Sequence, residues 1–77
     1  MTIADFTSQF EEKILSLEKG QLRPDFILNN SENWDSMAII ETMAFIDHSL
    51  GIQISIDHLL TSQTFGDILH LLGEKLN

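Results

Sequence analysis

The residues with the clearest capacity for chemistry are Asp35 and Ser36, which stand directly before an apolar helical segment. Asp and Ser are common helix N-caps, because a side-chain oxygen there accepts a hydrogen bond from a backbone N–H two or three residues later. A helix N-terminus also carries unpaired N–H groups and about half a positive charge, so a phosphate ester on Ser36 would lie in a favourable field. The two interpretations, a cap and a site for a phosphate ester, are compatible.

The other side chains that could bind a metal or act in catalysis are not arranged for either role. No two of the three histidines have the i, i+4 spacing of a helical zinc site, so the sequence predicts no metal centre. The histidines are His48, His58 and His70. Glu11 and Glu12 point in different directions on a helix, which does not suit an acid and base pair. We therefore expect no catalytic residues; a hydrolase that used Ser36 as its nucleophile would lack a placed base.

Length and composition describe one small acidic domain, residues 1–77. With 4 basic and 12 acidic side chains the net charge is −8, which disfavours nucleic acid and anionic membranes as partners and favours basic proteins. A hydrophobic content of 43% indicates a chain that folds, and the absence of cysteine excludes disulfides and thiolate chemistry. The chain starts without a basic segment before an apolar run, and no apolar stretch is of membrane-spanning length, so we expect a cytoplasmic protein.

The pattern of apolar residues predicts an all-α fold, a four-helix bundle of three longer helices and one short one. The first helix, capped by Thr2 with Asp5, is expected to end near Lys19, with Gly20 as its C-cap and Glu11 mostly on the solvent side. Further helices are predicted over 36–50, closed by Gly51, over 56–60, capped by Ser55, and over 65–76, where Thr64 and Asp67 have the spacing of a capping box. Alternating isoleucines in 52–56 resemble a strand, but a single strand would have no partner.

Residues 20–34 form a turn-rich connection with interspersed apolar residues. Loops of this length in compact domains are usually functional or disordered, and the apolar anchors favour a functional loop packed on the bundle. The anchors are Leu22, Phe26, Ile27 and Leu28. Trp34, at its end, is expected to pack as a lid over the loop.

The predicted helix 36–50 carries two apolar rows. The first, Ile39, Met43, Ile46 and Leu50, is sufficient to face the core. The second row consists of Met37, Ile40 and Ala44. Such a row is usually core, but one helix of a four-helix domain seldom buries two.

The segment around Ser36 resembles the acyl carrier protein and peptidyl carrier protein family, whose modification motif is Asp-Ser followed by Leu, Ile or Met at the start of helix II. The resemblance runs through NWDSMAIIETMAFIDHSLGIQIS, IDHLL and TFGDILHLL in the family's order and spacing, and it covers essentially the whole chain. One departure is Asn33, because many members have Gly three residues before the serine. Asn tolerates a positive φ better than other non-glycine residues, so we expect the turn to survive.

This resemblance implies that a 4′-phosphopantetheine group is joined to Ser36 through a phosphodiester, beside Asp35, and that its thiol holds acyl or aminoacyl groups as thioesters. The chain would then be no enzyme but a monomeric carrier that serves a phosphopantetheinyl transferase, a loading enzyme and a downstream synthase or transferase. The Trp34-Asp35-Ser36 variant and the stand-alone length suggest a specialised pathway, such as polyketide or nonribosomal peptide synthesis. The sequence leaves the cargo open.

The resemblance also implies that the second apolar row of helix 36–50 meets the partner enzymes, with acidic residues around it. The apolar contacts would be Met37, Ile40 and Ala44, and the acids Glu41, Asp47 and Asp57. Charges of this kind act mainly on association rate and partner choice. The alternative is a carrier-like interaction module without a cofactor, which regulates or scaffolds a partner through the same acidic face.

Overall fold

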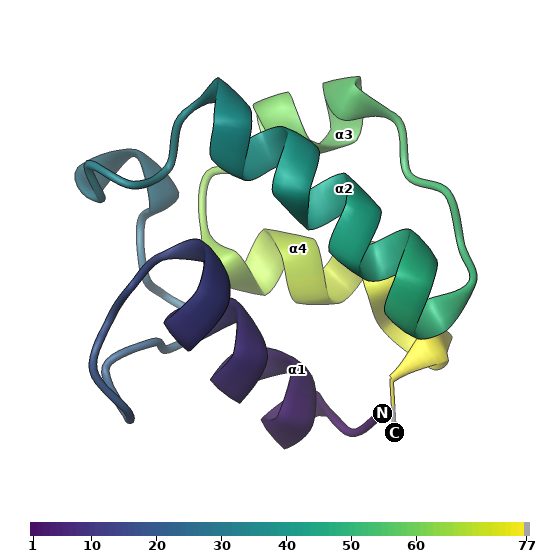
Figure 1. Ribbon diagram of the computed structural model, residues 1–77, viewed down its shortest axis with the longest axis horizontal. Helices are drawn as coiled ribbons and strands as arrows, with labels where there is room; N and C mark the ends of the chain where they lie inside the picture. Colours follow the sequence, from purple (N-terminus) through teal and green to yellow (C-terminus); the bar gives the residue numbers. More distant parts are fainter. Residues whose placement is uncertain (77) are drawn as a thin grey trace.

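The computed structural model describes residues 1–76, which form four α-helices (Figure 1). They are α1 (Ile3–Gln9), α2 (Ser36–Leu50), α3 (Ile56–Thr61) and α4 (Phe65–Leu72). A π-helical turn, η1 (Phe10–Ile14), continues α1, and two 3-10 turns, η2 (Leu28–Asn30) and η3 (Gly73–Lys75), occur later in the chain. Within residues 1–76 the β pairing is one isolated bridge, between Ile27 and Thr64, so the predicted all-α class is confirmed.

The helices pack around α4, which crosses between α1 and α2 (Figure 1). The short helix α3 lies beside α2, on the side away from α1. The long connection between α1 and α2 leaves the end of α1 and returns to the start of α2 at the same edge of the molecule. This edge therefore brings the end of α1 close to the start of the helix that carries Ser36.

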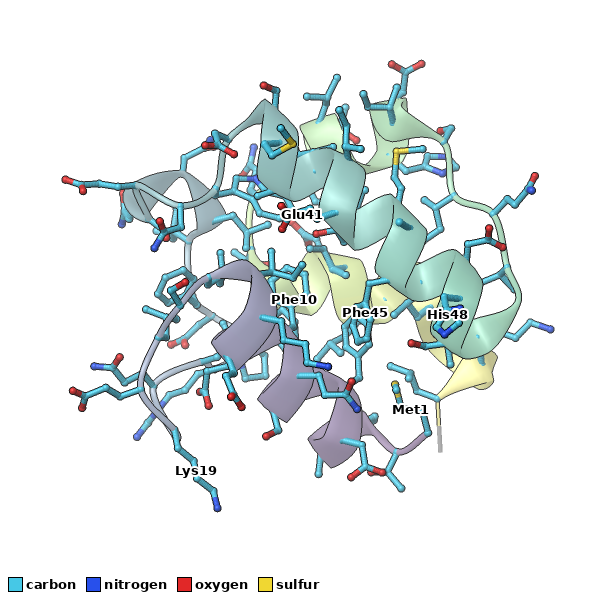
Figure 2. All side chains as sticks on the ribbon, viewed as in Figure 1. Met1, Phe10, Lys19, Glu41, Phe45 and His48 are labelled. Atoms are coloured by element: carbon cyan, nitrogen blue, oxygen red, sulfur yellow. The ribbon has the colours of Figure 1, made fainter. Side chains whose placement is uncertain are left out.

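Aromatic side chains from α1, η1, α2 and α4 form the centre of the core. The ring centroids of Phe10 and Phe65 are 5.1 Å apart, and Phe45 stacks on Phe6 at 5.4 Å. Figure 2 shows Phe10 and Phe45 on the facing sides of their helices. Aromatic pairs at such distances add about 0.5–1.5 kcal/mol beyond the burial of their area. Buried aliphatic residues surround them: Ile14, Leu15, Leu22, Leu28, Ala38, Ile39, Ile46, Leu59, Ile68, Leu72 and Leu76.

The first helix ends earlier than predicted, and it ends in a π-turn. The Leu15 N–H donates to the Phe10 carbonyl at 3.1 Å, five residues back, and Ser16 then takes a positive φ of 53°. The wider turn changes which side chains face the core, so Glu11 is buried and Ile3 is 47% exposed. The predicted end near Lys19 and the predicted solvent position of Glu11 are therefore wrong.

The buried carboxylate of Glu11 binds the backbone of the connection that follows. Its two oxygens accept from the Gly20 N–H at 3.1 Å each, and one of them accepts from the Leu22 N–H at 2.7 Å. A carboxylate in this geometry satisfies backbone donors that would otherwise be buried without partners. Gly20, with a φ of 93°, is part of this bound turn and not a helix C-cap.

The other helix boundaries follow their caps. Thr2, Ser55 and Thr64 cap α1, α3 and α4 as predicted, and α2 has the predicted bounds. Gly51 closes α2 with a φ of 69°. The predicted fourth helix is shorter than expected, because α4 ends at Leu72 and continues as a 3-10 turn.

Asp67 completes the cap of α4 and binds the residue before it. Its carboxylate accepts from the backbone N–H groups of Gln63 at 2.9 Å and Thr64 at 3.1 Å. These two hydrogen bonds favour the charged form and lower the pKa of the Asp67 carboxyl below its usual 3.8. The start of α4 is thus anchored through its own first turn.

Removal of the Glu11 carboxylate is expected to destabilise the protein. Glu11→Ala leaves the N–H groups of Gly20 and Leu22 without their acceptor, which lowers the free energy of unfolding by about 2–3 kcal/mol, measured by urea denaturation. The matched control is Glu12→Ala, since Glu12 is adjacent and exposed, and its effect should stay within about 0.5 kcal/mol. Equal stability of the two variants would contradict the role of Glu11.

Candidate functional site

Ser36 is the first residue of α2, and Asp35 is its N-cap. The Asp35 backbone is extended, with a φ of −124°, and its carboxylate accepts from the Ala38 N–H at 2.9 Å. The Asp35 carbonyl accepts the first intrahelical bond, from the Ile39 N–H at 3.0 Å. Of the two predicted candidates for the cap, the structure therefore selects Asp35.

The hydroxyl of Ser36 remains available. Ser36 is exposed, and its Oγ makes no hydrogen bond to any of the described residues. The hydroxyl lies at the positive end of a helix of 15 residues, where an attached phosphate group is stabilised by the helix dipole and by the unpaired N–H groups of the first turn. The residues present therefore suit a phosphodiester on Ser36.

The residues before Ser36 are held against the end of α1. The Asn33 side-chain amide donates to the Leu15 carbonyl at 2.8 Å. Trp34 is half-buried, and its ring centroid lies 5.9 Å from that of Phe10, which confirms the predicted packed position. Asn33 does not use its tolerance for a positive φ, because within residues 1–76 Ser16 is the one non-glycine residue with a positive φ.

The middle of the connection is bound to the start of α4. The N–H of Leu28 donates to the Gln63 carbonyl at 2.9 Å, and the N–H of Phe65 donates to the Phe26 carbonyl at 3.0 Å. Two of the predicted anchors, Leu22 and Leu28, are buried and Phe26 is half-buried, whereas Ile27 is 49% exposed. The loop is therefore packed on the bundle as predicted, with Ile27 as the exception.

Gly66 permits the closest approach of this loop to α4. Its N–H donates to the Pro24 carbonyl at 2.8 Å, and a Cβ on residue 66 would lie 2.9 Å from that same oxygen. The required absence of a side chain was not recognised from the sequence. The available sign was a glycine inside the first turn of a predicted helix, where glycine costs about 1 kcal/mol relative to alanine.

The predicted contact residues lie on one exposed face of α2. Met37 is 62% exposed and Ile40 56%, and Ala44, Glu41 and Asp47 are also exposed. Their positions, separated by three or four residues, fall on one side of a helix, while Ile39 and Ile46 on the other side are buried. We call Met37, Ile40, Glu41, Ala44 and Asp47 the outer face of α2.

The neighbouring helix α3 extends this surface. Asp57 is exposed as predicted, and Ile56 and Leu60 are 44% and 60% exposed. The exposure of Ile56 and Leu60 was not predicted from the sequence. The predicted length of the helix could have indicated their exposure, because a helix over 56–60 buries few side chains. In the structure Leu59 is the buried residue of α3.

Ser36 lines none of three hollows on the surface of the described residues, two of which share no lining residue. One, of about 270 Å³, lies between the outer face of α2 and the segment that follows it. It is lined by Met43, Ala44, Asp47, Gln53 and Ile54. The other, of about 360 Å³, is lined by Ser8, Glu11, Glu12, Leu17 and Lys19.

The titratable side chains are dispersed. All three histidines are exposed. In the part of the chain that the structure describes, no group of three or more His, Asp or Glu side chains is placed to hold a metal ion. None of the helices described in residues 1–76 is long and apolar enough to cross a membrane.

Comparison of this chain with protein-family models, with curated proteins and with solved structures gave no match.

Replacement of the cap is expected to destabilise α2. Asp35→Ala removes the acceptor of the Ala38 N–H and should lower the free energy of unfolding by about 1 kcal/mol in urea denaturation. Asp35→Asn keeps an acceptor oxygen and should cost much less. Asp25→Ala, at an exposed loop position, is the control; an equal effect of Asp25→Ala and Asp35→Ala would contradict the capping role.

Proposed function

We propose that this protein is a carrier that holds acyl or aminoacyl intermediates on a 4′-phosphopantetheine group attached to Ser36. The observation that supports the proposal most directly is the division of roles between two adjacent residues. Asp35 caps α2, so the Ser36 hydroxyl is not needed for the cap and stays exposed at the positive end of the helix. The resemblance of the surrounding sequence to carrier proteins supports the same function.

The Ser36 Oγ would accept the phosphopantetheinyl group from coenzyme A, under catalysis by a transferase. A bond forms between Oγ and the phosphorus as the phosphoanhydride P–O bond of coenzyme A breaks, adenosine 3′,5′-bisphosphate leaves, and the hydroxyl proton passes to a base of the transferase. When attached, the group supplies a thiol, which this cysteine-free chain lacks. The N-terminal field of α2 stabilises the negative charge of the phosphodiester.

The outer face of α2 would be the docking surface for the transferase and the loading enzyme. Exposed apolar side chains, Met37 and Ile40, stand beside the carboxylates of Glu41 and Asp47. Methionine adapts to differently shaped partners, and the acids attract basic docking surfaces. A carrier that must meet several enzymes in turn needs a surface of this kind.

The carrier function predicts a covalent change at one residue. Incubation of wild-type protein with coenzyme A and a phosphopantetheinyl transferase should add one phosphopantetheine mass, detected by intact-mass spectrometry. Ser36→Ala should gain none, whereas Ser8→Ala, at an exposed serine of α1, should be modified as wild type is. An unchanged wild-type mass with several transferases would count decisively against the carrier function.

The docking surface predicts a salt-dependent rate. Glu41→Lys should lower kcat/KM of the transferase about tenfold, equivalent to about 1.4 kcal/mol, and should weaken its dependence on ionic strength. Met37→Ala should lower kcat/KM without changing the salt dependence. The control is Glu12→Lys, because it makes the same change in net charge at an exposed residue of η1, which is not part of the outer face of α2. Equal losses for Glu12→Lys and Glu41→Lys would indicate a net-charge effect instead of a docking surface.

A module that docks partners without a cofactor remains the competing function, because the exposed outer face of α2 fits it equally well. The two functions differ in their dependence on Ser36. If Ser36→Ala preserves cellular function while Met37→Ala or Glu41→Lys abolishes it, the cofactor-free module is the correct function. If Ser36→Ala abolishes cellular function, the carrier is the correct function.

A further inference from the structure

We propose that Asn33 is a positioning residue for the modification of Ser36, because it ties the loop before α2 to the end of the first helix. The inference rests on the proposed carrier function and adds to it a residue that governs how Ser36 is presented to the transferase. It concerns a contact between two segments that are 18 residues apart in the sequence.

The end of the first helix provides the acceptor. A helix leaves its last carbonyl groups without intrahelical partners, and these need other donors when they are not fully exposed. Leu15 is the residue that follows η1, its side chain is buried, and Ser16 then directs the chain away with a φ of 53°. The Leu15 carbonyl accepts the Asn33 amide at 2.8 Å in a partly buried contact.

A second contact lies beside the first. Trp34 packs against Phe10, and the Leu15 N–H donates to the carbonyl of that same Phe10 at 3.1 Å. Asn33 and Trp34 are therefore held on neighbouring points of one π-turn. The residues that follow them, Asp35 and Ser36, leave this anchored pair and begin α2.

Asn33 is close enough to Ser36 in the chain for its hydrogen bond to Leu15 to restrict the position of the Ser36 hydroxyl. Three residues of fully extended chain span at most about 10 Å, so a shift of Asn33 cannot be absorbed far from Ser36. Ser36 itself is exposed, and its side chain makes no hydrogen bond to any of the described residues that would fix it. Its position relative to the outer face of α2 therefore depends on the cap at Asp35 and on the tie at Asn33.

The hydrogen bond to the Leu15 carbonyl is made by the side chain of Asn33 and not by its backbone. A glycine, which many carriers of the resembling family have at this position, would supply conformational freedom. Asn33 does not have a positive φ, however, so freedom is not what the position requires here. Replacement by glycine should therefore impair modification as replacement by alanine does.

The experiment compares Asn33→Ala and Asn33→Gly with Asn29→Ala, an exposed asparagine of the same loop. The rate of phosphopantetheine transfer is measured as kcat and KM for the carrier, and the emission of Trp34, the one tryptophan of the chain, reports the loop. Both Asn33 variants should lower kcat/KM about fivefold or more, mainly through KM, and shift the Trp34 emission to the red. Asn29→Ala should match wild type in both.

A second pair of variants covers the event that Asn33→Ala or Asn33→Gly unfolds. Asn33→Asp keeps the size and one oxygen of the side chain but lacks the amide donor, and Asn29→Asp makes the same charge change. Far-UV circular dichroism checks that both remain helical. Asn33→Asp should show the slower transfer and the red shift, and Asn29→Asp should show neither.

Two results would overturn the positioning role while leaving the carrier function intact. In the first, wild type and the Asn33 variants are modified at equal rates. In the second, the Asn33 variants are slow but Trp34 emission is unchanged, which would place Asn33 in direct contact with the transferase. A wild-type protein that is never modified would instead overturn the carrier function, and the positioning role with it.

Discussion

A single carboxylate closes the first connection of this protein. Glu11, buried in the π-turn η1, binds the backbone N–H groups of Gly20 and Leu22, and it thereby turns the chain back toward the bundle directly after the first helix. A buried charge is costly unless it is hydrogen-bonded, and here the donors are backbone groups that need an acceptor. The path of the connection to α2, and with it the place where Ser36 emerges, begins with this interaction.

The π-turn has a second effect on the same edge of the molecule. Its wider geometry brings Phe10 and Leu15 to the positions where Trp34 and Asn33 contact them. The last residues of the connection are thus held by the same turn that holds its first residues. A loop of this length, with both ends fixed on one structured turn, presents a defined start of α2 with little regular structure of its own beyond η2 and the bridge of Ile27 to Thr64.

Helix α2 combines two demands on one segment. One side packs Ile39 and Ile46 into the core, and the opposite side leaves Met37 and Ile40 in contact with solvent. Two large apolar side chains that are exposed next to carboxylates form a surface that is open to a binding partner. The high negative charge of the whole chain counteracts association between its copies.

Local features of the sequence predicted most of the fold. The caps Thr2, Ser55 and Thr64 and the C-cap Gly51 lie within the segments that they close, so short-range patterns were sufficient to identify them. The end of the first helix could not be predicted in the same way. The apolar residues up to Leu17 continue the 3.6-residue period, but Ser16 takes a positive φ and the Glu11 carboxylate binds Gly20 and Leu22, and a periodicity argument includes neither.

The candidate site shows the same division between local and distant contacts. Asp35 and Ser36 and the outer face of α2 follow from their own sequence and are exposed as predicted. The role of Asn33 depends on the carbonyl of Leu15, a partner far away in the chain. Local sequence therefore indicated a tolerance for unusual backbone angles at Asn33, while the folded protein uses its amide group.

The contact of Gly66 with Pro24 limits which sequences can adopt this architecture. A Cβ on residue 66 would lie 2.9 Å from the Pro24 carbonyl oxygen, so any other residue there would require this part of the connection to shift. A short Asp-Ser motif makes no such demand on the path of the chain. The glycine in the first turn of α4 and the buried glutamate at position 11 each bind a distant stretch of backbone, so they are more specific to this architecture than the serine.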